Sequence, residues 1–168
     1  MKKIHCEKFS SEYSVRRMSL DDVDIIYDLC LGNTQYYEYC TKEPSRELIE
    51  SDLTITPPGI PMEQKFYVGF FGGDDLVAVM DLIDGYPDEE STFLGFFMMK
   101  KELQGTGNGS RIISGVMDYL KELGFVRCQL GIDKDNPQSN HFWKKNGFEV
   151  IRVVEQEEGT ILVAERTL

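Results

Sequence analysis

The sequence lacks any apolar run close to the roughly 20 residues that a membrane-spanning helix requires. Its first residues also lack the apolar core of a secretory signal, so we expect a cytoplasmic protein with no membrane partner. The four cysteines have no C-x-x-C spacing, which favours reduced thiols and predicts neither a disulfide framework nor a metal site. Basic residues are scarce as well. There are 18 Lys and Arg against 29 Asp and Glu, and the net charge of -11 argues against a nucleic-acid partner.

The charge that is present is unevenly distributed. Residues 100–147 contain eight basic and five acidic residues, whereas the rest of the chain contains ten basic and 24 acidic residues. The locally positive segment suits a polyanionic ligand, and the acidic remainder would attract a cationic second substrate. An acidic surface that only keeps the protein soluble would also explain most of the excess.

The most informative segment is glycine-rich and reads Gln104-Gly105-Thr106-Gly107-Asn108-Gly109-Ser110. It follows the apolar run 92–99 and precedes an amphipathic stretch, 111–122, so it connects a predicted strand to a predicted helix. Such a connection leaves main-chain N–H groups pointing at open space, and the helix start adds unpaired donors and the positive end of its dipole. The segment therefore predicts a site for a phosphate or a pyrophosphate.

Hydrophobic periodicity and turn residues predict alternating elements within one domain, residues 1–168. Seven strands are expected, at residues 13–18, 65–71, 76–84, 91–99, 126–132, 148–155 and 160–166. Four helices are expected, at residues 20–31, 45–53 and 111–122 and between Asn136 and Gly147. The continuous apolar run 91–99 favours a strand buried on both faces, and the unit 91–132 should be parallel and right-handed.

Two kinds of nucleotide-binding loop fit the glycine-rich segment poorly. A nucleoside-triphosphate loop requires Lys-Ser or Lys-Thr after its last glycine, but Gly109 is followed by Ser110-Arg111. The dinucleotide fingerprint requires glycine where Ser110 stands, and it requires more strand–helix units than the remaining residues can form. A nucleotide-dependent enzyme is therefore a disfavoured alternative.

A third pattern fits better. The glycine-rich segment contains the spacing Gln104-x-x-Gly107-x-Gly109, and Met99 lies five residues before Gln104. This pattern resembles the acyl-CoA signature of the GNAT superfamily of N-acetyltransferases. The resemblance extends to a second family motif, an asparagine after the fifth strand and a short helix ending in Gly-Phe, here Asn136-Pro137-x-Ser139-x-x-Phe142-Trp143-x-x-Asn146-Gly147-Phe148.

This resemblance covers nearly the whole chain and implies a fold of the α/β (α+β) class. The expected architecture is a single N-acetyltransferase domain with a mixed, mostly antiparallel central sheet of about seven strands. About four helices would flank that sheet, and its fourth and fifth strands would be parallel and splayed apart.

By the same resemblance, acetyl-CoA would be the co-substrate and would lie between the splayed strands. The main chains of Met98, Met99 and Lys101 would pair with the pantetheine arm, and the N–H groups of residues 104–110 would bind the pyrophosphate. Asn136 would bond to the pantetheine amides, although a helix-capping role also explains this residue. Lys145 would contact phosphates, although it could equally well be an ordinary solvated surface residue.

The implied reaction is direct attack of an amine on the acetyl thioester, with a base to deprotonate the amine and a main-chain N–H at a bulge near Met98-Met99 to stabilise the oxyanion. The sequence departs from the family at Trp143, where many relatives have a tyrosine acid, and at Phe93, where they have a glutamate. An indole N–H donates a hydrogen bond but is no practical acid, so Trp143 would pack against the cofactor arm. Asp81, otherwise expected on a solvated strand face, and Tyr86 are the substitute catalytic candidates.

Tyr36, Tyr37 and Tyr39 fall in the region that lines the acceptor pocket of related proteins. Together with Glu38 they would form an aromatic, acidic cup for an ammonium group, although ordinary loop packing explains them equally well. The expected acceptor is a cationic small-molecule amine or a protein amino group. The departures from the family pattern leave a catalytically silent acyl-CoA-binding or regulatory protein as the alternative. The oligomeric state stays open, a homodimer included.

Overall fold

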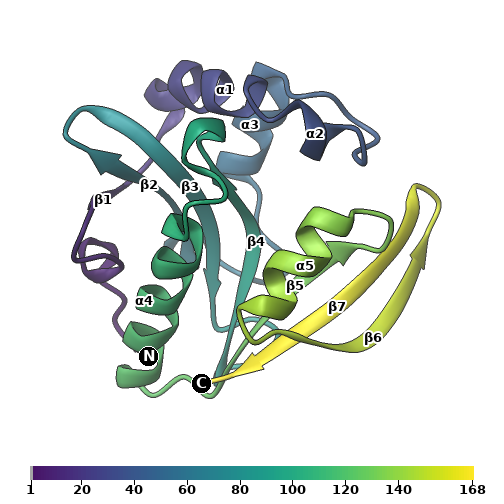
Figure 1. The fold of residues 1–168 in the computed structure, drawn as a ribbon. Coiled ribbons are helices and arrows are strands. Elements are labelled where there is room, and N and C mark those ends of the chain that lie inside the picture. The colour runs from purple at the N-terminus through teal and green to yellow at the C-terminus, as the bar shows by residue number, and fades with distance from the viewer. Residues whose placement is uncertain (1) are drawn as a thin grey trace.

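The computed structural model describes residues 2–168 and contains one continuous sheet (Figure 1). Its strands are β1 (Ser14–Arg17), β2 (Lys65–Gly72), β3 (Asp75–Asp84), β4 (Ser91–Met99), β5 (Arg127–Asp133), β6 (Glu149–Gln156) and β7 (Gly159–Thr167). Their order in the sheet is β1-β2-β3-β4-β5-β7-β6, in which β4 and β5 are parallel and the other five neighbouring pairs are antiparallel. The mixed seven-stranded sheet expected from the sequence is confirmed.

The described residues form five α-helices, α1 (Val23–Leu31), α2 (Thr34–Tyr37), α3 (Arg46–Thr54), α4 (Asn108–Glu122) and α5 (Pro137–Lys145). Short 3-10 helices lie at Cys6–Lys8, Leu20–Asp22, Met62–Gln64 and Lys101–Leu103. Helices α1 and α3 pack on one face of the sheet, around Ile26, Ile49 and Val79. Helices α4 and α5 pack on the other face, where Ile113 and Trp143 belong to the larger core.

Local signals explain how the first helix begins. Ser19 and Asp22 form a capping box, in which Asp22 Oδ2 accepts the N–H of Ser19 at 2.8 Å. The helix predicted at 20–31 starts there as a single 3-10 turn and continues as α1. The sequence pattern does not predict α2, because its four residues are too few to show a helical apolar period.

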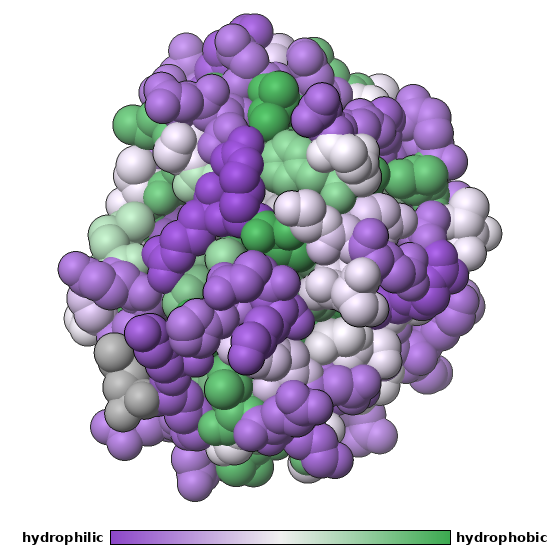
Figure 2. Space-filling view, turned by 90° about the vertical axis from the view of Figure 1, so that its left-hand side faces the viewer, coloured by the Kyte–Doolittle hydropathy of each residue, from purple (hydrophilic) through white to green (hydrophobic). Residues whose placement is uncertain are grey.

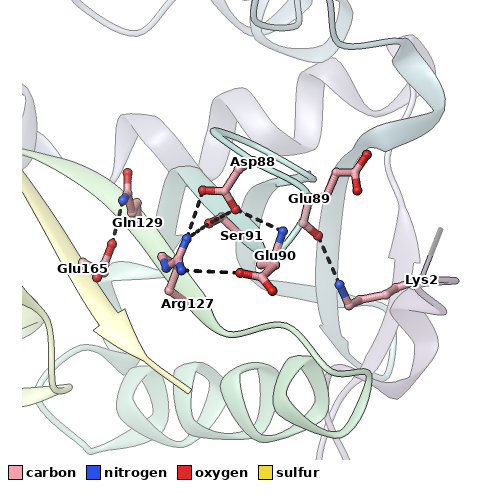
Figure 3. Close-up of polar contacts among 8 residues, drawn as sticks. All are labelled: Lys2, Asp88, Glu89, Glu90, Ser91, Arg127, Gln129 and Glu165. Carbon is pink, nitrogen blue, oxygen red and sulfur yellow. Dashed lines mark hydrogen bonds and ion pairs between the residues drawn. The ribbon is translucent and has the colours of Figure 1, made fainter.

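Strands β4 and β5 pair over only part of their length. Ser91–Leu94 lie beside Arg127–Leu130, and beyond these residues neither strand has a register partner in the other. At the paired end, the Arg127 guanidinium donates to Asp88 at 3.0 Å and to Ser91 at 3.3 Å, and it lies 3.6 Å from Glu90 (Figure 3). The two strands are therefore fastened at one end and open at the other, which confirms the expected splay.

The second half of β4 is less buried than the sequence predicts. Gly95 is exposed and Phe96 and Phe97 are half-buried, whereas Leu94 before them and Met98 after them are buried. The prediction of a strand buried on both faces is therefore wrong for this stretch. The reason is the missing neighbour: where β5 has diverged, the apolar side chains of β4 line open space.

The predicted β-bulge is also present, but at a different residue. Asp81 of β3 pairs with Phe96, and Leu82 pairs with Leu94, so Gly95 has no partner in β3. The bulge thus lies at Gly95, earlier in the strand than the predicted position at Met98-Met99. It coincides with the point where β5 leaves β4.

Figure 2 shows the face that carries β1 and α4, where hydrophilic side chains cover most of the surface and apolar ones form small, separate areas. The most exposed large apolar side chains include Ile55 after α3 and Val150 and Val153 on the edge strand β6. Within residues 2–168, no helix combines the length and the apolar character needed to cross a membrane.

Candidate functional site

A cavity of about 380 Å³ opens where β4 and β5 diverge. Its lining draws on both layers of the core. Phe97 and Trp143 pack with the core under α4 and α5, whereas Phe96 and Tyr36 pack with the core under α1 and α3. The cavity therefore passes through the gap in the sheet, and two ligands that enter from opposite faces could meet inside it.

The glycine-rich segment presents its main chain to this cavity. Gly105 and Gly107 line it and adopt φ values of 75° and 84°, a left-handed conformation that favours glycine. Within the described chain, the N–H groups of residues 105–110 have no main-chain acceptor, and no side chain caps α4. The helical ladder begins only with Arg111, whose N–H donates to the Gly107 carbonyl at 3.1 Å. Consecutive free donors at the positive end of a 15-residue helix form the geometry of an anion site.

The side chain of Gln104 fastens this segment to its surroundings. Its Nε2 donates to the Met99 carbonyl at 3.1 Å and to Asn33 Oδ1, and its Oε1 accepts from Gln138 of α5 at 3.3 Å. Asn33 Nδ2 donates to the same Met99 carbonyl at 3.1 Å. Three elements therefore meet at Gln104: the end of α1, the end of β4 and the start of α5.

These contacts also fix which edge of β4 is free. Because the Met99 carbonyl accepts from side chains at the cavity, it points away from β3. Main-chain groups alternate in direction along an antiparallel strand, so those of Phe97 face the same side, which β5 has left, and those of Met98 face β3. Phe97 and Met99 are thus the residues of β4 that can present main-chain groups to a ligand.

Helix α5 supplies the opposite wall. Asn136 is 2% exposed, and its Oδ1 accepts the N–H of Ser139 at 3.1 Å, so the predicted capping role is confirmed. Trp143 is buried against Phe142 and Phe148, with ring centroids at 4.8 Å and 5.2 Å. This aromatic wall faces the glycine-rich segment. The exposed Lys145 also belongs to the lining, as the only lysine that residues 2–168 contribute to it.

The region around α2 forms the remaining side of the cavity. Tyr36 and Tyr39 line it, and the Tyr36 ring contacts Phe96 edge-on with centroids 6.1 Å apart. Tyr37 lies outside the lining and packs against Tyr36 at 5.1 Å. Burial raises the pKa of Tyr36 and Tyr37 well above the usual tyrosine range, so both hydroxyls stay protonated at neutral pH. Two of the three tyrosines of the predicted cup therefore reach the cavity.

Several other residues predicted for the site do not line the cavity, namely Asp81, Tyr86, Lys101, Thr106 and Asn108. The Thr106 hydroxyl turns back to the Leu103 carbonyl at 2.6 Å, and Asn108 Oδ1 accepts from Arg111. Lys101 is exposed on the 3-10 turn before the segment.

Tyr86 lies in the turn between β3 and β4, where its ring contacts Phe93 edge-on at 5.5 Å. Phe93 belongs to the stretch of β4 that is paired with β5. The turn therefore sits at the closed end of the strand pair, away from the opening that creates the cavity.

Asp81 is buried, contrary to the solvated position expected from the sequence. Lys65 Nζ donates to its Oδ2 at 2.7 Å, and the two side chains are only 4% and 13% exposed. Asp81 Oδ1 has no hydrogen-bond partner in the described part of the chain. A Cβ added to Gly95 would lie 3.0 Å from Oδ2, so the carboxyl packs directly against the bulge. Burial raises the pKa of Asp81, while Lys65 opposes the shift.

Asp52 of α3 belongs to the same charge cluster, and burial, followed by the negative charge of Asp81, raises its pKa to about 6. The folded protein therefore holds this proton more tightly than the unfolded chain. The resulting stability is fully present below the unfolded pKa of about 4 and is lost as the pH rises through about 6. We expect Asp52→Asn to raise the free energy of unfolding by about 1 kcal/mol at pH 8, after allowance for solvent screening of a half-buried carboxyl, and to change it little at pH 4.

Urea unfolding at the two pH values, followed by the fluorescence of Trp143, measures this difference. Glu50→Gln, which neutralises an exposed carboxyl on the same helix, should give no pH-dependent gain. An equal gain from Asp52→Asn at both pH values would contradict the assignment of the raised pKa to Asp52.

Sequence reasoning missed several residues of the lining, among them Asn33, Cys40, Phe96, Phe97, Asp133 and Phe142. For Asp133 a signal exists, because it directly follows the predicted strand 126–132, the parallel partner of the strand before the glycine-rich segment. Ligand sites form beyond the carboxyl ends of such strands. Asn33 and Cys40 gave no comparable signal, since the α2 region reaches the cavity only through tertiary packing.

The model of the acetyltransferase (GNAT) family matches residues 29–148, well over half of the chain. No curated protein matches the sequence. Among solved structures, an acetyltransferase from Thermus thermophilus is 21% identical with a TM-score of 0.74, and the match covers 93% of this chain and 97% of that one.

Two further solved structures are similar in fold. A PaiA N-acetyltransferase from Thermoplasma acidophilum in complex with coenzyme A is 17% identical, with a TM-score of 0.67 and coverage of 93% of this chain and 99% of that one. A spermidine N-acetyltransferase chimera from Vibrio cholerae and hSSAT is 17% identical, with a TM-score of 0.69 and coverage of 94% of this chain and 96% of that one. With the family match, the splayed parallel strands and the glycine-rich turn all in agreement, the chain belongs to the GNAT acetyltransferase family.

Proposed function

We propose that this protein transfers an acetyl group from acetyl-CoA to a primary amine of a small molecule or a protein. The observation that carries the proposal is the row of free N–H groups at residues 105–110, a segment that lines the cavity between β4 and β5 through Gly105, Gly107, Gly109 and Ser110. Such a row can donate hydrogen bonds to a diphosphate, and the dipole of α4 favours its negative charge. The coenzyme A complex of the Thermoplasma neighbour supports the same ligand for this chain.

The gap between β4 and β5 gives the pantetheine arm a path to the centre of the sheet. The free main-chain groups of Phe97 can pair with its amides as an added strand would. Asn136 can donate its Nδ2, because the helix cap uses only Oδ1. Phe142 and Trp143 supply an apolar wall along this path. A main-chain N–H at the bulge around Gly95 would stabilise the thioester oxygen as it gains negative charge.

The acceptor amine would approach from the face that carries Tyr36 and Tyr39. The C–N bond forms as the amine attacks, and the C–S bond then breaks to release the thiolate of CoA. A thiol of pKa about 8.5 leaves as an anion at a cost of about 2 kcal/mol at pH 7, so the reaction does not require Trp143 to act as an acid. The spermidine acetyltransferase neighbour supports a cationic amine as the acceptor class.

Two measurements test this function. Titration calorimetry with acetyl-CoA should give micromolar binding, and release of free thiol should follow when a diamine, a polyamine, an aminoglycoside, an amino acid or a short peptide is added. Absence of acetyl-CoA binding would overturn the proposal. Binding of acetyl-CoA without release of the CoA thiol in the presence of any of these amines would favour the alternative, a catalytically silent acyl-CoA-binding or regulatory protein. That alternative is motivated by Trp143 and Phe93, which stand where many relatives have a tyrosine and a glutamate.

Gly107→Ala should weaken acetyl-CoA binding about tenfold. An L-residue at a φ of 84° is strained by about 1–2 kcal/mol. The segment can relieve that strain only by a change in its backbone, which turns its N–H groups away from the ligand and so weakens binding. Gly73→Ala is the matched control, because Gly73 also has a positive φ, 62°, but lies in the β2–β3 turn, where an added Cβ would meet open space. Both variants should lose similar stability. Equal affinities in calorimetry would contradict a role of the Gly107 backbone in binding.

A further inference from the structure

Asp133 is the only carboxylate that lines the cavity within residues 2–168. It is the last residue of β5 and lies three positions beyond Leu130, where the pairing with β4 ends. The side chains of Cys128, Leu130 and Ile132 belong to the core under α4 and α5. Because strand side chains alternate, Asp133 projects to the opposite face, where Phe96 and Tyr36 line the same cavity.

This carboxylate has spare binding capacity. It is half-buried, and the ion pairs of the described chain do not include it. Its Oδ1 accepts the N–H of Asp135 at 2.9 Å, which leaves Oδ2 free for a ligand. The negative charge of Asp133, together with the larger effect of burial, raises the pKa of Tyr36 and of Cys40, so both side chains lie within its field.

The other carboxylate near the reaction centre is in a different situation. Asp81 already binds Lys65 at 2.7 Å and does not line the cavity. Its carboxyl packs against Gly95, which does line the cavity, since a Cβ at that residue would lie 3.0 Å from Oδ2. An incoming ammonium group would therefore meet Asp133 and not Asp81.

We propose that Asp133 binds the ammonium group of the acceptor and accepts its proton before the amine attacks the thioester. This role rests on the proposed acetyl transfer. One proton of R–NH3+ passes to the Asp133 carboxylate, the nitrogen lone pair forms the C–N bond, and the C–S bond breaks to give the CoA thiolate. The thiolate takes the second proton lost by the nitrogen, and Asp133 returns its proton to water. The chemical class of the acceptor is thus a primary amine that arrives as a cation.

Asp133→Asn tests the role, because the amide keeps an oxygen that can accept the N–H of Asp135. The loss of a positioned base should lower kcat/KM about 1,000-fold at pH 7, measured by thiol release with the amine that the wild-type protein acetylates fastest. Acetyl-CoA affinity and urea stability should be unchanged. Asp135→Asn is the control, since that carboxyl is exposed two residues away and outside the cavity lining.

The pH profile separates proton acceptance from a structural role. With Asp133 present, kcat/KM should stay level between pH 7 and 9, because the amine binds as the ammonium ion, its main form at these pH values, and loses its proton to Asp133 within the site. In Asp133→Asn the amine must lose its proton to water first. For an amine of pKa about 10, the rate should rise about tenfold per pH unit, so the deficit should shrink to about tenfold at pH 9. The same cavity is faced by other titratable side chains, Tyr36 and Cys40 from the α2 side and His141 and Lys145 from α5. These four are present in both the wild-type protein and Asp133→Asn, so they do not cause a difference between the two pH profiles.

Three results would overturn the role of Asp133: wild-type activity in Asp133→Asn, an equal loss in Asp135→Asn, or a deficit that is constant from pH 7 to 9. Each of these leaves acetyl transfer by the wild-type protein intact. If the wild-type protein binds acetyl-CoA but releases thiol with none of the amines, the proposed function fails instead, and the role of Asp133 fails with it.

Discussion

Lys65→Met is expected to lower the free energy of unfolding by about 3–5 kcal/mol at pH 8, because it leaves the buried charge of Asp81 without its partner. The Asp81 carboxylate accepts a single hydrogen bond, from Lys65 Nζ, and its second oxygen already has no partner in the described chain. Loss of that bond removes both the opposite charge and the only donor. Urea unfolding followed through the fluorescence of Trp143, the sole tryptophan, measures the change.

The size of this loss should depend on pH and on Asp81. Without Lys65, the folded protein favours protonated Asp81, so its pKa rises further above the unfolded value of about 4. The destabilisation is then complete above the folded pKa and disappears as the pH falls below the unfolded one. The double variant Lys65→Met, Asp81→Leu removes both charges and should recover most of the lost stability. A double variant as unstable as Lys65→Met alone would show that packing, and not the unpaired carboxylate, causes the effect.

The buried pair also shows where sequence reasoning stops. Strand β3 is buried along nearly its whole length, so its alternation carries no sign that Asp81 points into the protein. The partner, Lys65, lies 16 residues earlier at the start of β2, and only the register between β2 and β3 brings the two together. A pattern within one strand cannot reveal a charge pair that depends on the pairing of two.

The half of the cavity formed by the glycine-rich turn and α5 was easier to predict than the half formed by the α2 region. The strand 91–99, the glycine-rich turn and the capped helix after Asn136 each have local signals, and the structure contains all three. The bulge at Gly95 and the exposure of Phe96 depend on where β5 stops pairing with β4, which no local pattern encodes. The tyrosine-rich region contributes Tyr36 and Tyr39 to the cavity lining, but only tertiary packing decides that Tyr36 faces the cavity and Tyr37 does not.

Gly109→Val is expected to weaken acetyl-CoA binding at least about 100-fold, the equivalent of about 2.7 kcal/mol. Gly109 is buried in the cavity lining on the first turn of α4, and a Cβ there would lie 3.3 Å from the Phe142 ring and 3.4 Å from Met99 Cγ. The two valine methyl groups extend further than the Cβ and take up space in the cavity that Gly109 lines, where we expect them to hold the diphosphate away from the start of α4. A diphosphate held off that row loses hydrogen bonds to a charged group, which are worth about 1.5–3 kcal/mol each.

Ser114→Val separates this steric effect from the helix propensity of valine, because Ser114 is exposed on α4 and outside the cavity lining. Calorimetry should find wild-type affinity in Ser114→Val and near-complete loss of binding in Gly109→Val. The thermal midpoints of the two variants then show whether the fold of Gly109→Val is retained. Should Gly109→Val bind acetyl-CoA as tightly as the unmodified chain, the diphosphate does not lie against the N–H groups at the start of α4, around residue 109.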